Sequence, residues 1–117
     1  GRVAVVGMGR LKEKGDPPAL LDVLLDKQER PEVRAAAAEA LGAMRHIDAG
    51  PALMDAMSDD SDLARAAAGA AMSNLTGLKV EFSARGSFQQ RQHAIDIYRR
   101  AWPRFYPELV KMKARGG

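Results

Sequence analysis

Apolar residues recur along this sequence with the spacing of one face of an amphipathic α-helix. The first apolar stripe consists of Val33, Ala36, Ala37, Ala40, Leu41 and Met44. A matching stripe consists of Ala64, Ala67, Ala68, Ala71, Met72 and Leu75. Alanine has the highest helix propensity, and its small side chain lets neighbouring helices approach closely. The pattern therefore predicts two alanine-rich helices that pack tightly.

Each alanine-rich helix is preceded by a shorter apolar segment that also repeats. PALLD at residues 18–22 and PALMD at residues 51–55 are offset by 33 positions, and Arg34 and Arg65 by 31 positions. The unit is therefore a short helix, a turn and an alanine-rich helix. One such hairpin cannot bury both of its faces, so successive units must stack and share an interior. The sequence predicts an all-α solenoid.

The segments DPPALLDVLLDKQERPEVRAAAAEALGAM and PALMDAMSDDSDLARAAAGAAMSNL resemble the HEAT repeat family. More narrowly, they are similar to the short bacterial HEAT-like repeats that also occur in phycobilisome lyases. The matching features are Pro18 and Pro51, Asp26 and Asp59, and the helix EVRAAAAEALG, and the resemblance spans roughly residues 2–77. It implies an armadillo-like, right-handed α-solenoid that serves as a scaffold for proteins or nucleic acids.

The expected domain organisation is HEAT-like repeats over residues 1–78, with the first unit incomplete, and a loop plus C-terminal capping helices over residues 79–117. In the second part, Ser87 and Gln90 have the spacing of a capping box at a helix start. An apolar face follows through Tyr98 to Trp102, and this helix is expected to stop before Pro103. Pro107 would then open a last short helix. LTG…SFQQRQHAIDIYRRAW resembles the closing segment of some bacterial HEAT-like domains.

The two chain ends and the composition add three expectations. VAVVGMGRL is expected to form an inner helix without its covering partner, and so to favour self-association at the open N-terminal end. Because Gly1 is not Met, the natural chain is expected to begin earlier. The chain has no cysteine, no apolar run of the roughly 18 residues that span a membrane and no signal-like segment, so a cytoplasmic location is favoured.

No residue pattern predicts catalysis, a cofactor or a metal site. His46 and His93 are the only histidines and lack an H-E-x-x-H or comparable ligand spacing. Asp59, Asp60 and Asp62 lack the spacing of a calcium loop, and are interpreted as solvated acids beside a helix start that Asp60, Ser61 or Asp62 caps. Trp102 is interpreted as a residue that covers the end of the core. The chain is therefore not expected to be an enzyme.

Charge is distributed unevenly, and it supplies the candidate binding residues. Residues 1–78 carry nine Lys and Arg against twelve Asp and Glu, whereas residues 79–117 carry nine against three. The candidate partner-binding residues are Arg34, Arg65, Arg91, Arg99, Arg100 and Arg104. The favoured function is a non-catalytic protein–protein interaction scaffold. Two alternatives remain: nucleic-acid binding through the basic C-terminal third, or an accessory subunit of a lyase-like enzyme, by analogy of fold.

Overall fold

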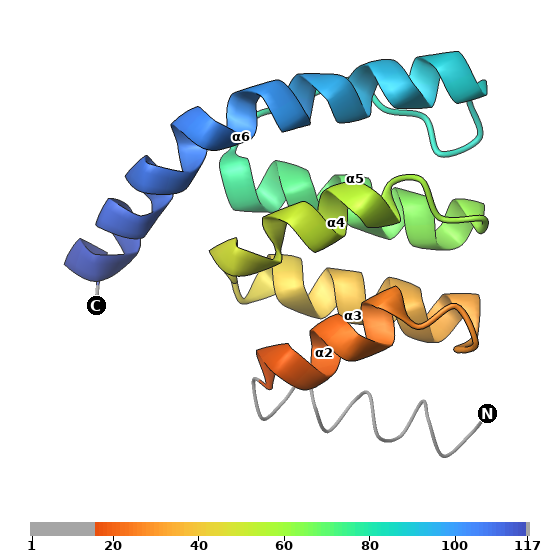
Figure 1. The fold of residues 1–117 in the computed structure, drawn as a ribbon, viewed down its shortest axis with the longest axis horizontal. Helices are drawn as coiled ribbons and strands as arrows, with labels where there is room; N and C mark the ends of the chain where they lie inside the picture. The colour runs from red at the N-terminus through yellow and green to blue at the C-terminus, as the bar shows by residue number, and fades with distance from the viewer. Residues whose placement is uncertain (1–15, 117) are drawn as a thin grey trace.

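The computed structural model describes residues 16–116, and every regular element in this range is helical (Figure 1). The elements are α2 (Pro17–Leu25), α3 (Pro31–Ala43), a short 3₁₀ helix η1 (Ile47–Ala49), α4 (Gly50–Ala56), α5 (Asp62–Thr76) and α6 (Phe88–Gly116). The all-α prediction is confirmed. The expected inner helix VAVVGMGRL, with its open end, lies outside the described residues.

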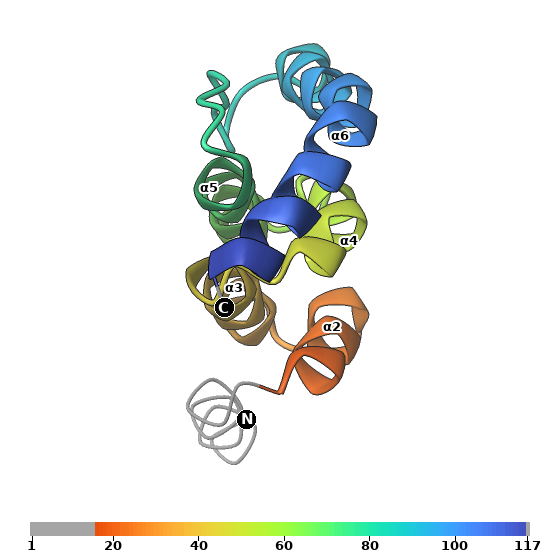
Figure 2. The same cartoon turned by 90° about the vertical axis from the view of Figure 1, so that its left-hand side faces the viewer.

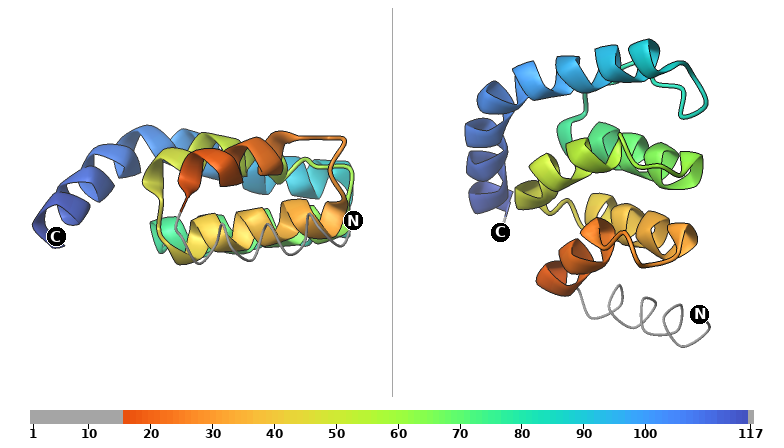
Figure 3. Two further views of the ribbon diagram at one scale, coloured as in Figure 1. Left: turned by 90° about the horizontal axis from the view of Figure 1, so that it is seen from below. Right: turned by 45° about the vertical axis from the view of Figure 1, so that its right-hand side comes forward.

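The helices stack as two-helix units in two layers. Figure 2 shows α3 and α5 side by side in one layer and α2 and α4 in the other, and the left view of Figure 3 shows the same two layers from below. The largest interface between helices joins α3 to α5. The first half of α6 continues the layer of α2 and α4, while residues 77–87 cross over α5. The predicted stacking of repeated units is therefore confirmed.

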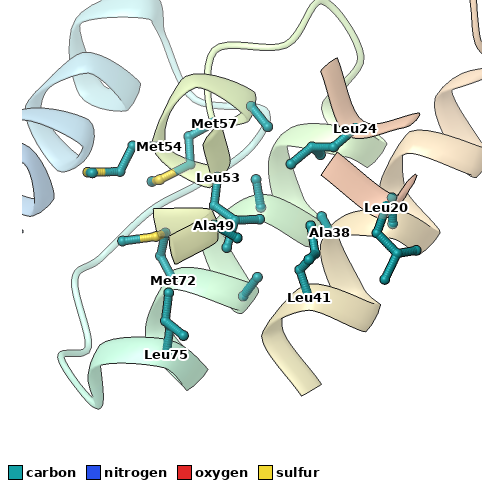
Figure 4. Packing of buried hydrophobic residues seen from close by; sticks show 14 of the residues in the cluster. Leu20, Leu24, Ala38, Leu41, Ala49, Leu53, Met54, Met57, Met72 and Leu75 are labelled. Carbon is teal, nitrogen blue, oxygen red and sulfur yellow. The ribbon is translucent and has the colours of Figure 1, made fainter. Parts of the chain in front are cut away.

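The interior lies between the two layers, where both predicted alanine stripes point. Leu20 and Leu24 of α2, with Leu53 of α4, fill the space against the alanine-rich layer (Figure 4). Ala37 and Ala68 are completely buried. Burial of side chains this small brings little apolar area but permits a very short separation between helices.

Gly42 lies at a close approach of α3 to α5. A Cβ atom added to Gly42 would lie 2.8 Å from both the Cα and the Cβ of Ala71. Because one of these is a backbone atom, no rotamer change could relieve the contact. The separation of the two central helices is thus set by a glycine facing an alanine.

Helix starts follow the sequence signals in part. Proline occupies the first turn of α2, α3 and α4, where its missing N–H removes no helical hydrogen bond. The Ser87–Gln90 capping box forms in both directions, with distances of 3.1 and 3.0 Å. Ser61, one of the three predicted caps of the next alanine-rich helix, occupies the N-cap position of α5, but its side chain makes no capping hydrogen bond.

The predicted break before Pro103 is also wrong. α6 continues through Pro103 and Pro107 to Gly116. Each proline lacks an N–H and crowds the preceding turn, so it bends a helix whose two halves are otherwise well formed. Figure 1 and the right view of Figure 3 show the second half of α6 turning away from the direction of its first half and running past the C-terminal ends of α3 and α5. One bent helix therefore replaces the two expected capping helices.

Substitution of Gly42 tests the close approach of α3 and α5. Gly42→Leu should lower the free energy of unfolding by about 2–3 kcal/mol, because the added side chain must push the helices apart. Ala43→Leu, at the next and exposed position, should stay within about 0.5 kcal/mol of the wild type. Urea denaturation followed by circular dichroism measures both. Equal stability of the two variants would contradict a close approach of α3 and α5 at Gly42.

Candidate functional site

Three of the six candidate arginines donate hydrogen bonds to the backbone of the chain itself. In Arg34, Arg65 and Arg91, Nη1 donates a hydrogen bond to the carbonyl oxygen of the residue five positions earlier. The acceptors are Glu29, Asp60 and Gly86. Each acceptor lies in the turn before the arginine's own helix, so the same clamp closes the turns before α3, α5 and α6. This shared role explains why Arg34 and Arg65 repeat in the sequence.

Arg34 also joins one unit to the next through a buried ion pair. Its Nε lies 3.0 Å from Oδ2 of Asp59, and its Nη2 lies 2.9 Å from Oδ1. Arg34 is 5% exposed and Asp59 is 1% exposed. The interpretation of Asp59 as a solvated acid is therefore wrong, and Arg34 departs from the expected role because its guanidinium is already engaged inside the protein.

The Asp59 carboxylate accepts hydrogen bonds from three residues that lie in different parts of the fold. Besides Arg34, it accepts hydrogen bonds from the backbone N–H of Ser61 at 2.9 Å and from Nζ of Lys27 at 3.3 Å. Burial alone would raise the pKa of Asp59, but the bonds from Arg34, Ser61 and Lys27 outweigh it and hold that pKa below its ordinary value. The same pair raises the pKa of Arg34. Asp59 is thus ionised in the folded state and orders the α4–α5 turn.

Arg65 repeats this link one unit further along. Its Nε donates to the carbonyl of Ala84 at 2.8 Å, and its Nη1 also donates to the carbonyl of Asp59 at 2.8 Å. Ala84 belongs to the segment that crosses over α5, so Arg65 fixes that segment to the repeats. Its half-buried side chain is accordingly part of the framework.

Arg99 and Trp102 attach the first half of α6 to α4. Nη2 of Arg99 pairs with Oδ1 of Asp55 at 2.8 Å. The indole ring of Trp102 lies directly over Gly50, where an added Cβ would come within 2.2 Å of the ring. One turn later, Oη of Tyr106 donates to Oδ1 of Asp48 at 2.8 Å. Trp102 thus covers the core end, as expected, and these contacts fix where the bend of α6 begins.

Arg100 and Arg104 lie elsewhere, at the edge of a large groove that the bend creates. This α6 groove has a volume of about 1200 Å³ and lies between the second half of α6 and the C-terminal ends of α3 and α5. One wall is an apolar stripe of α6 formed by Ile97, Ala101, Phe105, Leu109 and Met112. The opposite wall contains Met44, Ile47, Leu75 and Leu78.

The edge of the α6 groove is basic. Arg45, Arg100, Arg104 and Lys113 line it together with a single carboxylate, Glu108, among the described residues. Within residues 16–116, Arg100 and Arg104 take part in no salt bridge. Both are exposed and one helical turn apart, so their charges are available to a ligand in the groove.

The groove offers apolar contact and positive charge, and its lining includes no histidine. His46 is half-buried beside η1, and His93 is exposed on the first half of α6. Among residues 16–116, no three His, Cys, Asp or Glu side chains are grouped in a way that could hold a metal ion. The arrangement is suited to binding a partially apolar, negatively charged surface.

Sequence reasoning missed the apolar half of this site. Phe105, Leu109 and Met112 follow Ile97 and Ala101 at separations of three or four residues, which is the signature of a helix face. That signal could have been found, but the expected stop before Pro103 divided the stripe between two helices. The opposite wall depends on the tertiary fold, and no local pattern indicates it.

Comparisons with known proteins identify the repeats. A family model described as HEAT repeats matches residues 2–73. No curated protein and no solved structure matches the chain.

A membrane-spanning role has no candidate helix in the described part of the chain. None of α2 to α6 combines the length and the apolar character needed to cross a membrane.

A double-mutant cycle tests the structural role of Arg34. Arg34→Met and Asp59→Leu should each lower the free energy of unfolding by about 3–5 kcal/mol, because each leaves a buried charge without its partner. The double variant should lose about 2 kcal/mol less than the sum of the single losses. Chemical denaturation gives the three values. If a single variant does not fold, a folded double variant would establish the coupling; strictly additive losses would refute it.

Acid should destabilise the protein through Asp59. Because the pKa of this carboxyl is lowered on folding, the unfolded chain binds the proton more readily. Its stabilising effect is therefore complete above the unfolded pKa of about 3.9 and is lost as the pH falls through the lower, folded value. Between pH 5 and pH 2.5, the free energy of unfolding of Asp59→Asn should fall less steeply than that of the wild type or of the exposed control Asp22→Asn. Parallel curves for all three proteins would contradict this assignment.

Proposed function

Because the chain belongs to the HEAT-repeat family, we propose that it is a non-catalytic protein-interaction module that binds its partner in the α6 groove. HEAT repeats are commonly protein-interaction scaffolds, and the family is typically non-catalytic. An accessory role beside a lyase-like enzyme would be one case of this proposal, with the enzyme as the protein partner.

The observation that carries the proposal is the incomplete packing of the second half of α6. Met112 is 61% exposed and lines the groove, while Phe105 and Leu109 are only half-buried. An amphipathic helix normally buries its apolar face against another element. Here the face is turned toward the stack but is held away from it by a hollow. A groove of this kind supports protein binding because apolar anchors supply most of the affinity in protein interfaces.

Nucleic acid is the other ligand class that exposed Arg100, Arg104 and Lys113 could serve. Two observations favour protein. The floor of the groove between these cations is apolar, and phosphates would gain nothing from it. In addition, the indole ring of Trp102 packs over Gly50, so that face of the ring is not free to stack on a base.

Capture from a lysate of the source cells, with and without nuclease, tests the proposal. Met112→Glu places a charge in the groove, whereas Val110→Glu changes a residue on the same helix that is 41% exposed and outside the groove lining. The wild type and Val110→Glu should retain the same protein after nuclease treatment. Met112→Glu should bind it about tenfold more weakly, as expected for loss of an interface anchor.

Two results would count against this function. Captured material that disappears after nuclease would assign the basic edge to nucleic acid. A protein retained equally by Met112→Glu and Val110→Glu would place the binding surface outside the groove. Matching circular dichroism spectra and melting temperatures for the two variants ensure that a loss of binding is not a loss of fold.

A further inference from the structure

Resting on the proposed function, we infer that the occupant of the α6 groove is an acidic amphipathic helix of a partner protein. Its apolar face would pack between the walls of the groove, and its carboxylates would meet the cations at the edge.

The walls favour a helical occupant. Both are built from helix faces and helix ends, whose backbone groups are largely bonded within the helices, so they offer no strand edge to an extended peptide. A chain entering an apolar groove must then satisfy its own backbone hydrogen bonds, and a helix does so. Measured along the bent axis of α6, the apolar stripe from Ile97 to Met112 is about 22 Å long at 1.5 Å per residue, so a straight partner helix of four turns or fewer is long enough to cover it.

The positive charge at the edge of the groove indicates that the partner helix is negatively charged. Four cations face one carboxylate among the described lining residues, and Arg100 and Arg104 lie in a row along the groove. Complementary charge steers association and excludes wrong partners. The partner helix is therefore expected to carry acidic residues on both sides of its apolar face. A second copy of this chain inserting its own α6 would bring Arg100, Arg104 and Lys113 against the same cations. Charge therefore argues against that occupant.

The backbone of Arg45 supplies an independent indication. Arg45 follows α3 and has a φ of +51°, which is the left-handed conformation. Two hydrogen bonds of 3.1 Å close the helix end there. The N–H of Arg45 donates to the Gly42 carbonyl, and the N–H of His46 donates to the Leu41 carbonyl. Glycine is the residue that this helix ending favours. Gly77, which ends α5, has a φ of +73° and follows the rule.

At the end of α3 the chain thus carries an arginine where glycine would relieve backbone strain. The side chain that this arginine supplies lines the α6 groove. Strained residues of this kind persist at functional sites. The left-handed conformation of Arg45 therefore places a cation at this edge at a position where glycine would fit with less strain.

Synthetic peptides test the inference directly. The probe is an 18-residue helical peptide with leucines along one face and glutamates on both sides of it. One matched peptide replaces every glutamate with lysine, and another scrambles the leucine spacing. In fluorescence anisotropy, the wild-type protein should bind the acidic peptide at least about tenfold more tightly than either control peptide, with affinity that falls as salt rises.

Variants of the protein locate the binding. The double variant Arg100→Glu, Arg104→Glu should bind the acidic peptide about tenfold more weakly and the lysine peptide more tightly, because reversing the edge charges reverses the preference between the peptides. Arg45→Gly should raise the melting temperature while weakening the acidic peptide several-fold, and Arg45→Lys should keep most of the binding. Val110→Glu should leave the peptide preference unchanged.

The possible failures are distinguishable. Equal or undetectable binding of the acidic and lysine peptides overturns the inference, and the proposed function survives if Met112→Glu still loses a captured protein. Displacement of the acidic peptide by a single-stranded oligonucleotide, or a dimer in sedimentation analysis that Met112→Glu abolishes, also overturns the inference by assigning the groove to another occupant. A more stable Arg45→Gly protein with unchanged peptide affinity removes the argument from Arg45.

Discussion

The short separation between α3 and α5 is the constraint on which the rest of the structure depends. Gly42 faces Ala71, and fully buried alanines continue the contact along both helices. Because the two helices are so close, leucine and methionine side chains of α2 and α4 can cover them from one side and complete a thin interior. The same spacing brings the ends of α3 and α5 together, and these ends form one wall of the α6 groove.

Arginines then hold successive units in register. Each clamp arginine closes the turn before its own helix, and Arg34 and Arg65 also reach the following unit. The buried pair of Arg34 and Asp59 specifies one arrangement of neighbours, since a shifted unit would leave a charge buried without its partner. Charge inside the stack is therefore used for structure, whereas the charge of Arg100 and Arg104 remains at the surface.

Sequence periodicity predicted the stacked helices because the residues of each stripe act locally and repeat. It could not separate clamp arginines from surface arginines, since Arg34 and Arg100 differ only in what the fold brings near them. The sequence predicts a helix stop before Pro103 and a new helix from Pro107, although contacts of Trp102 with Gly50 and of Tyr106 with Asp48 on neighbouring elements support one bent helix instead. Because the groove depends on that bend, the apolar half of the candidate site was not predicted from the sequence.

In the proposed function, the bend of α6 is the feature that turns a stack of repeats into a binding site. Hydrogen–deuterium exchange of the protein with and without its captured partner tests this most directly. With the partner bound, we expect slower exchange in residues 97–113 of α6 and in the ends of α3 and α5 around residues 44–47 and 75–78. Slower exchange confined to α2 and the first half of α4, with the second half of α6 unchanged, would contradict it.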